Sequence, residues 1–277
     1  MIPFDFEYYK PASIEQAVEW FQRLQAQGKH PMYFSGGTEI ITLGRLSYVR
    51  PGAVVDIKSI PECGVLEFRQ DRLIIGASVT LSALSAANPF PLLSGTAQGI
   101  ADQTARNSIT LGGNVCSAFY YREAVLPLLL ADSRLVVAGP GGTREVSIHD
   151  VFLEQIRLAD GEFVVQTMTD REYASLPFVH YKKRQIGNVG YPLVTMAALK
   201  KDNRIRTAYS GVCSFPFRSA AIEQALNHAS LPLSDRIAQA IDRLPAPILS
   251  DVEGSAAYRG FVLKQTMADA VSELEGR

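Results

Sequence analysis

Two glycine pairs with polar neighbours are the residues of this chain whose types and spacing indicate chemistry. The first pair lies in residues 35–39 (SGGTE) and the second in residues 110–114 (TLGGN). Glycine admits positive φ and lets a ligand approach the main chain without a Cβ in the way. Successive N–H groups in such turns can point the same way and form an anion-binding nest. Ordinary tight turns would explain either pair alone, but two such loops favour one phosphate-rich ligand, such as a dinucleotide.

The common nucleotide-binding motifs are missing from the sequence. It contains neither the Gly-x-x-x-x-Gly-Lys-Ser/Thr of a P-loop nor a Gly-x-Gly-x-x-Gly after a strand. A dinucleotide at these loops therefore requires another fold.

Composition limits the class of protein. The 277 residues are 47% hydrophobic, with a net charge of −1 and no basic stripe, which predicts a substantial core and no nucleic-acid partner. The longest apolar run, residues 125–131, is too short to span a membrane, and no signal peptide is recognised, so the cytoplasm is expected. Cys63, Cys116 and Cys213 stand apart, which predicts no iron–sulfur cluster and no metal site in this chain.

Hydrophobic periodicity and turn residues predict mixed helices and strands. A helix behind Ser13, a strand over 31–34 that enters the first loop, and a strand over 54–57 form the first domain, residues 1–57. The second domain, residues 58–172, is expected to contain the following elements: strands over 65–68 and 73–76, helices from 82, over 92–104 and over 124–131, and a hairpin of 135–138 with 144–148. A C-terminal domain, residues 173–277, is expected to contain these: strands over 178–182, 193–199 and 204–209, and helices over 219–228, 234–244 and 255–274.

With the loops placed, the chain resembles the FAD-binding, or medium, subunit of molybdenum hydroxylases, the family of bacterial xanthine dehydrogenases and aerobic carbon monoxide dehydrogenases. The loops resemble its Ala-Gly-Gly-Thr-Asp and Thr-Ile-Gly-Gly-Asn patterns. Residues 129–144 match the stretch after the second loop. Gly211, Pro216 and Arg218 match its Gly-Val-Ala-Pro-x-Pro-x-Arg segment, and residues 254–259 match its Gly-Ser-x-x-Tyr-Arg helix start. The resemblance covers nearly the whole chain.

The resemblance implies an α+β fold in which two subdomains of the vanillyl-alcohol-oxidase-like type hold FAD, followed by an α+β C-terminal domain. It also implies the FAD-site residues. The first pyrophosphate loop comprises Tyr33, Phe34, Ser35, Gly36, Gly37, Thr38, Glu39 and Ile40, and the second comprises Thr110, Leu111, Gly112, Gly113 and Asn114. The main-chain N–H groups of both loops, with the Thr110 hydroxyl, would meet the phosphates.

Four further residues match FAD-site positions of the family. Glu123 stands where the family has an aspartate that bonds the adenosine ribose, and Ile100 and Leu158 stand at apolar positions around the flavin. Lys182, in the charged run 182–184, falls near the family's flavin-site lysine. Core packing would also explain Ile100 and Leu158, and a solvated charge run would also explain Lys182.

Two segments depart from the family pattern. Residues 119–122 (FYYR) replace the usual Ser-Pro, and residues 185–192 (QIGNVGYP) lack the usual acidic residue. The aromatic run 119–121 is expected either to stack on adenine or to alter the path by which an electron acceptor reaches the flavin.

By resemblance, FAD takes electrons from a [2Fe–2S] small subunit and passes them to NAD+ or another acceptor, while a large molybdopterin-binding subunit hydroxylates the substrate. The expected assembly is a dimer of heterotrimers. Two alternatives stay open: a stand-alone FAD-dependent oxidoreductase of the same fold, and a flavin-free assembly subunit. A flavin absorbance spectrum separates the flavin-free alternative from the other two.

Overall fold

The structure is a computed structural model that describes residues 2–187 and 189–276. The chain forms two units, and both draw on the middle of the sequence. Unit 1 consists of Met1–Pro89, Ala101–Ser117 and Ser133–Arg171, and unit 2 of Phe90–Ile100, Ala118–Asp132 and Glu172–Arg277. The chain therefore passes from one unit to the other five times. The domain boundaries expected at residues 57 and 172 stay predictions.

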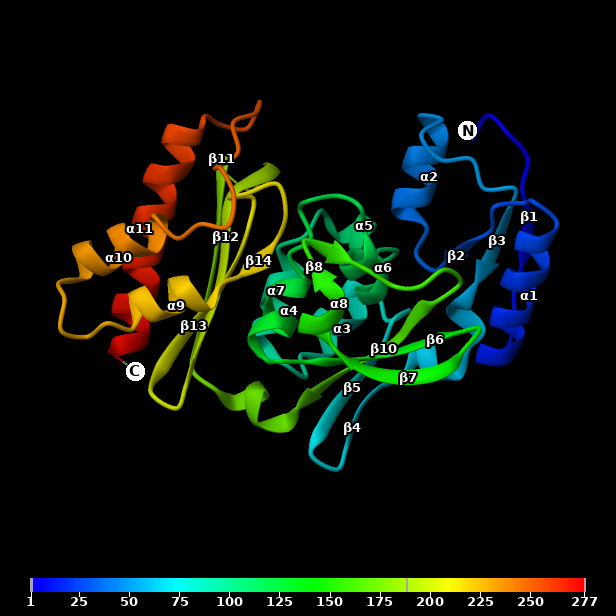
Figure 1. The fold of residues 1–277 in the computed structure, drawn as a ribbon, viewed down its shortest axis with the longest axis horizontal. Helices are drawn as coiled ribbons and strands as arrows, with labels where there is room; N and C mark the ends of the chain where they lie inside the picture. The colour runs from blue at the N-terminus through cyan, green and yellow to red at the C-terminus, as the bar shows by residue number, and fades with distance from the viewer. Residues whose placement is uncertain (1, 188, 277) are drawn as a thin grey trace. The chain divides into compact units, whose positions relative to one another are not determined.

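Unit 1 begins with a small parallel sheet of three strands in the order β1-β3-β2 (Figure 1). Its strands and helices are β1 (Glu7–Tyr9), α1 (Ile14–Ala26), β2 (Met32–Phe34), α2 (Thr38–Arg45) and β3 (Ala53–Asp56). The helix predicted behind Ser13 is confirmed, because the Ser13 side chain caps α1 by accepting from the Gln16 N–H at 3.3 Å. Strand β1 was not predicted, since it is only 3 residues long and mostly exposed.

A five-stranded antiparallel sheet in the order β4-β5-β10-β6-β7 makes up the second part of unit 1. Its strands are β4 (Leu66–Arg69), β5 (Arg72–Gly76), β6 (Arg134–Gly139), β7 (Gly142–Ser147) and β10 (Phe163–Asp170). The hairpin β6–β7 is confirmed, whereas the central strand β10 was not predicted. Shorter elements of unit 1 are η1 (Ile57–Ser59), η2 (Pro61–Gly64), α3 (Leu81–Ala87), α5 (Gln103–Arg106), α6 (Leu111–Cys116), α8 (Ile148–Val151), β8 (Phe152–Leu153) and β9 (Gln155–Ile156).

Tyr33 joins the two sheets of unit 1. Its ring stacks on Phe21 of α1 at 4.5 Å between centroids and lies 4.4 Å from the Phe163 ring of β10. Its hydroxyl donates to the Gly161 carbonyl oxygen at 2.9 Å. Tyr33, predicted to belong to the first loop, is therefore an aromatic packing residue immediately before that loop.

Unit 2 is built on an antiparallel sheet in the order β11-β12-β13-β14. Its strands and helices are α4 (Pro91–Gln98), α7 (Val125–Leu130), β11 (Phe178–Ile186), β12 (Val189–Lys201), β13 (Arg204–Ser210), β14 (Phe217–Arg218), α9 (Ala220–Leu226), α10 (Leu233–Ile241) and α11 (Ala256–Glu275). The short η3 (Arg171–Ser175) precedes β11. The three long strands and the three helices predicted for this part of the chain are confirmed.

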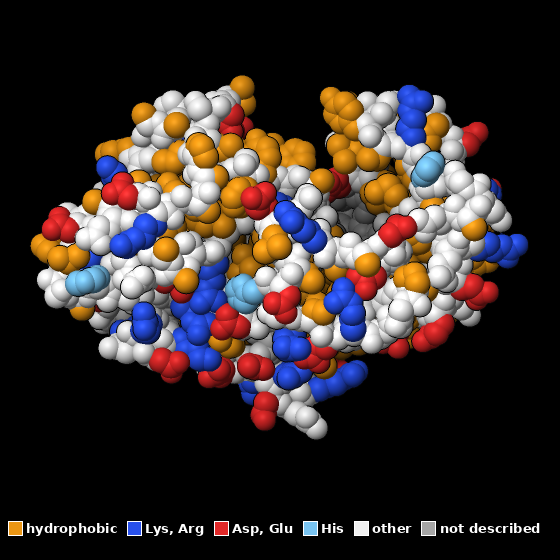
Figure 2. All heavy atoms as spheres, viewed as in Figure 1, with side chains coloured by type: hydrophobic (Ala, Val, Ile, Leu, Met, Phe, Trp, Pro, Cys, Tyr) orange, Lys and Arg blue, Asp and Glu red, His pale blue; other side chains and the backbone are white. Residues whose placement is uncertain are grey.

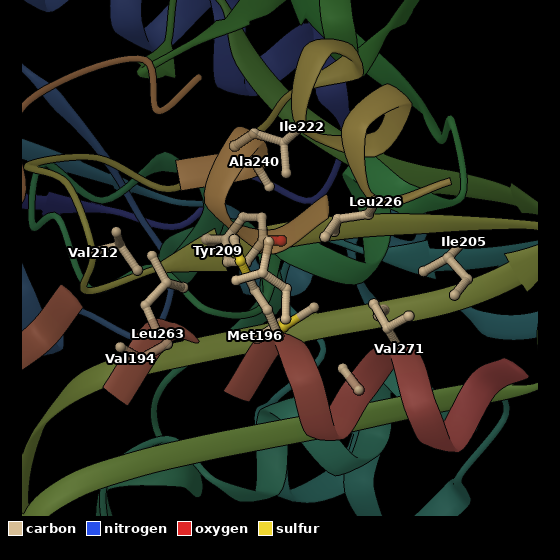
Figure 3. Close-up of a cluster of buried hydrophobic side chains, with 14 of the residues drawn as sticks. Val194, Met196, Ile205, Tyr209, Val212, Ile222, Leu226, Ala240, Leu263 and Val271 are labelled. Carbon is tan, nitrogen blue, oxygen red and sulfur yellow. The ribbon is translucent and has the colours of Figure 1, made fainter. Parts of the chain in front are cut away.

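Both faces of the unit 2 sheet are covered. Val194 and Met196 of β12 point into a core shared with Tyr209 of β13 and with Leu263 and Val271 of α11 (Figure 3). The β12 residues that alternate with Val194 and Met196 are also buried. They lie on the opposite face of the sheet, against which α4 and α7 pack. Burial on both sides explains why β12 has a nearly continuous apolar sequence instead of an alternating one.

The helix predicted over residues 92–104 is wrong in extent. Helix α4 ends at Gln98 with Gly99 as its C-cap, and α5 begins only at Gln103. Ala101 between them has φ = +46°, a left-handed conformation that a continuous helix excludes. The chain also leaves unit 2 for unit 1 at this point.

Arg259 of α11 connects separate segments of unit 2. Its side chain is fully buried and its Nη1 donates to the carbonyl oxygens of Leu193 and Gly211, both at 2.8 Å. Its Nη2 pairs with Asp251, and Ser255 caps the same helix by accepting from the Tyr258 N–H at 3.2 Å. Burial opposes ionisation of Asp251, but the hydrogen bond and charge of Arg259, together with the main-chain N–H groups of Glu253 and Gly254, lower the pKa of this carboxyl.

We expect Arg259→Met to lower the free energy of unfolding by about 3–5 kcal/mol, because it leaves buried carbonyls and Asp251 without their donor. Urea denaturation followed by circular dichroism measures the change. Arg243→Met, at an exposed position of the same unit, is the control and should stay within about 0.5 kcal/mol of wild type. An Arg259→Met protein as stable as the control would contradict the structural role.

Candidate cofactor site

The first glycine loop lies between a parallel strand and the start of a helix. β2 ends at Phe34 and α2 begins at Thr38, with Gly37 as its N-cap. Gly37 has φ = +70°, which favours glycine, and no side chain caps this helix. The N–H groups of a helix's first turn have no partner within the helix, and together with the helix dipole they suit an anion.

The two glycine loops touch each other through their main chains, and this contact belongs entirely to unit 1. A Cβ built on Gly36 would lie 1.9 Å from the Ser108 carbonyl oxygen and 3.4 Å from the Thr110 nitrogen. No side chain fits there without displacing backbone. The sequence predicts that two glycine loops far apart in the chain meet, and the structure brings them into contact.

The segment that follows β5, residues 77–80, holds both loops. The Ser35 hydroxyl donates to the Ser78 hydroxyl at 2.9 Å, and the Leu111 N–H donates to the Val79 carbonyl oxygen at 2.9 Å. Thr80 and Thr110 form a further antiparallel bridge. Sequence reasoning missed this segment, whose signal is the alternation of hydroxyl and apolar residues directly after a strand.

The N–H groups of the second loop differ from expectation. The Gly112 N–H donates to the Ala77 carbonyl oxygen at 2.9 Å, and the Gly113 N–H donates to the Thr110 Oγ1 at 3.2 Å, because Thr110 caps α6. Both groups predicted to meet phosphates are therefore used inside the protein. The Thr110 hydroxyl still has its own proton to donate.

A buried carboxylate lies beside the first loop. Asp56, at the end of β3, is fully buried and pairs with Lys58 at 2.7 Å. The Tyr8 hydroxyl also donates to Asp56, and this hydrogen bond, with burial, raises the pKa of Tyr8 to about 12. Sequence reasoning missed these residues, since their pairing follows from strand order and leaves no local pattern.

The other predicted residues of unit 1 are placed as follows. Leu111 and Asn114 are buried in α6, and the Asn114 N–H donates to the Thr110 carbonyl oxygen at 2.9 Å. Glu39 and Ile40 lie in the first turn of α2. Leu158 is half-buried in the segment between β9 and β10.

Glu123 and Lys182 belong to unit 2, where they form an ion pair. Their side chains are 3% and 9% exposed, and Lys182 Nζ lies 2.5 Å from Glu123 Oε1. Thr195 of β12 donates to the same Oε1 at 2.9 Å, and Lys182 also donates to the Gly99 carbonyl oxygen at 2.8 Å. The carboxylate predicted to bond a ribose is thus buried and already accepts two protein donors.

The Gly99 carbonyl, at the end of α4, attracts a second cation. Arg184 Nη2 donates to it at 2.9 Å. Burial, together with the nearby charges of Lys182 and Arg184, lowers the pKa of His180 to about 4, so this imidazole is neutral near pH 7. Ile100, the next residue after Gly99, is buried in unit 2.

The two segments that depart from the family pattern pack against each other. The Tyr121 ring stacks on Tyr191 with centroids 4.5 Å apart, and Phe119 lies 5.7 Å from Tyr191. Residue 188 of the second segment lies outside the described residues. Figure 2 shows hydrophobic side chains gathered over the end of unit 2 where β11 and the start of α11 lie.

A comparison with protein families decides the class of this chain. The family model described as the FAD binding domain in molybdopterin dehydrogenase matches residues 4–168. The chain belongs to this family.

Relatives of the family cover the chain almost completely. It is 24% identical to the carbon monoxide dehydrogenase medium chain of Hydrogenophaga pseudoflava over 282 residues, 96% of this chain and 97% of the relative. It is also 24% identical to the xanthine dehydrogenase FAD-binding subunit of Escherichia coli O157:H7, over 99% of both chains. Among solved structures, the chain matches the carbon monoxide dehydrogenase of Hydrogenophaga pseudoflava. The match covers 100% of this chain and 99% of the chain in that structure, with a TM-score of 0.87 at 24% identity.

These matches confirm the resemblance to the FAD-binding subunit of molybdenum hydroxylases, the α+β fold, FAD as the cofactor and the oxidoreductase class. They do not test the individual FAD-site residues. In the described part of the chain, no helix combines the length and the apolar composition that a bilayer crossing requires.

We expect Gly36→Ala to separate the two loops, because its Cβ would meet the Ser108 carbonyl oxygen at 1.9 Å. Overpacking of this kind typically costs about 1–3 kcal/mol of folding free energy. Gly64→Ala is the matched control, since nothing lies within 4 Å of its Cβ. Thermal unfolding of both variants is the measurement, and equal melting temperatures would contradict the main-chain contact.

We expect Glu123→Ala to destabilise the protein by about 3–5 kcal/mol, because it leaves the buried Lys182 ammonium without its counter-ion. Glu19→Ala, at an exposed position of α1, serves as control. Restoring stability by adding Lys182→Met to Glu123→Ala, in a double-mutant cycle of urea denaturation, would support the pair. Additive losses would instead show that the two side chains act separately.

Proposed function

We propose that this chain is the FAD-containing electron-transfer subunit of a molybdenum hydroxylase complex. In this role it takes electrons from a [2Fe–2S] subunit and passes them to NAD+ or another acceptor. The main-chain contact between the two glycine loops carries the proposal, because it builds one site from two segments about seventy residues apart. Family membership directs the choice of ligand for that site.

The residues at the loops suit the pyrophosphate of FAD. The first turn of α2 follows Gly37 as its N-cap, and glycine has no side chain to bond the N–H groups of that turn. Each loop also contributes a hydroxyl group. The Ser35 hydroxyl donates to the Ser78 hydroxyl, and the Thr110 hydroxyl accepts from the Gly113 N–H. We propose that the phosphates bind at the start of α2 and that the second loop supports this segment, with the Thr110 hydroxyl as its donor to the ligand. When bound, FAD would supply the redox chemistry.

The remaining predicted residues stay proposals that rest on the family pattern. Leu158, Ile100, Glu123 and Lys182 keep the roles that the family pattern assigns. Because Glu123 and Lys182 pair with each other, we expect any contribution of either residue to FAD binding to depend on both. Stacking of the aromatic run 119–121 on adenine would compete with its packing on Tyr191.

We also propose two partner subunits, a small [2Fe–2S] chain and a large molybdopterin-binding chain, in a dimer of heterotrimers in the cytoplasm. The relatives named medium chain or FAD-binding subunit belong to multi-chain enzymes in those organisms. This chain has three cysteines, of which Cys63 and Cys213 are buried in different units, so an external source of electrons fits its composition.

We expect gentle purification from the native host to recover this chain with two others, carrying one FAD per copy of this chain. Flavin absorbance and mass spectrometry measure both. Anaerobic addition of NADH should then bleach the flavin absorbance if NAD+ is the acceptor, and an intact spectrum assigns another acceptor. A chain recovered alone and without flavin, even after incubation with FAD, would point to the flavin-free alternative.

Two glycine variants test the FAD site directly, one at the second loop and one as its control. A Cβ on Gly113 would lie 2.9 Å from the Thr110 Oγ1, so Gly113→Val should displace that hydroxyl and abolish FAD binding. Gly64→Val, where the Cβ meets nothing within 4 Å, should bind FAD like the wild type.

A further inference from the structure

Lys58 lies beside the first glycine loop, although it belongs to η1, which follows the neighbouring strand β3. Phe34, the last residue of β2, pairs with Asp56, the last residue of the parallel strand β3, so the segments that follow both strands leave the sheet at the same edge. Lys58 Nζ donates to the Ser35 carbonyl oxygen at 2.9 Å and lies 4.6 Å from the centre of the Phe34 ring. Lys58 thus contacts both residues that lead into the loop.

Asp56 fixes the position of the Lys58 side chain. Asp56 Oδ2 lies 2.7 Å from Lys58 Nζ, and Asp56 Oδ1 accepts from the Lys58 main-chain N–H at 2.9 Å. The carboxylate is fully buried, whereas the lysine side chain is 43% exposed. A buried carboxylate requires such partners, so the ion pair holds the ammonium at the loop.

The bond to Ser35 sets the direction of the next N–H group. In a trans peptide the C=O and the following N–H point in opposite directions, so the Gly36 N–H points away from Lys58. A cation at the carbonyl also polarises the peptide and makes that N–H a stronger donor. The Phe34 ring under Lys58 lies against Gly37, since a Cβ there would meet Phe34 Cζ at 2.1 Å. Lys58 therefore fixes the loop immediately before the start of α2.

We propose that Lys58 is a positioning residue for FAD: it orients the first glycine loop through the Ser35 carbonyl, so that the loop and the start of α2 receive the pyrophosphate. The inference rests on the proposed function and adds a residue to it. Lys58 would act through Ser35 and Phe34.

The test compares FAD binding to the full-length apoprotein of wild type, Lys58→Met and Lys58→Arg. Loss of one charge-assisted hydrogen bond should weaken FAD binding by about tenfold in Lys58→Met. Lys58→Arg restores a cationic donor and should bind within about threefold of wild type. The melting temperature of the Lys58→Met apoprotein should fall, because the buried Asp56 carboxylate loses its counter-ion, and Lys58→Arg should restore it. The spectrum of the flavin that does bind should be that of the wild type.

Lys29→Met is the matched control, because Lys29 belongs to unit 1, pairs with Glu7 and is 31% exposed, yet it contacts neither loop. It should bind FAD like the wild type. Wild-type affinity in Lys58→Met would overturn the inference and leave the proposed function standing. A large fall in melting temperature without rescue by Lys58→Arg would also overturn it, in favour of a purely structural role. Failure of the wild type itself to bind FAD would instead refute the proposed function.

Discussion

The contact of Gly36 with the Ser108 carbonyl is the constraint on which the site in unit 1 depends. Both partners are main-chain atoms. Position 36 therefore has no room for a side chain, and the contact does not depend on the side chain at position 108. Ser78 and its neighbours bond to both loops and hold them at this distance. A site made in this way depends on backbone path, which explains how the fold persists at 24% identity.

Local patterns predicted those elements whose ends carry a chemical signal. Ser13 and Ser255 cap α1 and α11 as their sequences indicate, and the glycine-rich turn marks the β6–β7 hairpin. Strand β10 was missed because Gln166 and the threonines interrupt its apolar run, although it pairs with two neighbouring strands. The sequence predicts both glycine loops. The proposed role of Lys58 was not predicted, because it depends on β2 and β3 being neighbours in the sheet. The sequence likewise gives no sign that the Gly112 N–H is used internally.

The two departures from the family pattern belong together. Tyr121 and Tyr191 come from separate segments, yet their rings stack within 4.5 Å in unit 2. Phe119 extends the stack, and burial raises the pKa of Tyr121 well above its usual range. An aromatic residue in one segment without its counterpart in the other would leave a large apolar surface in water. The two changes are thus one change in packing, made at two places in the sequence.

The passage of the chain between units has a consequence for synthesis on the ribosome. All six residues of α7 are buried in unit 2, largely against β12 and β13, which are made later. From Leu130 to the end of β13 at Ser210 the ribosome adds 80 residues, which takes on the order of ten seconds. Throughout that interval the sheet that covers this apolar helix is incomplete, whereas unit 1 has all its residues once Arg171 is made. A short hydrophobic segment is therefore left without its packing partners during synthesis, and the two units cannot be expressed as separate contiguous fragments.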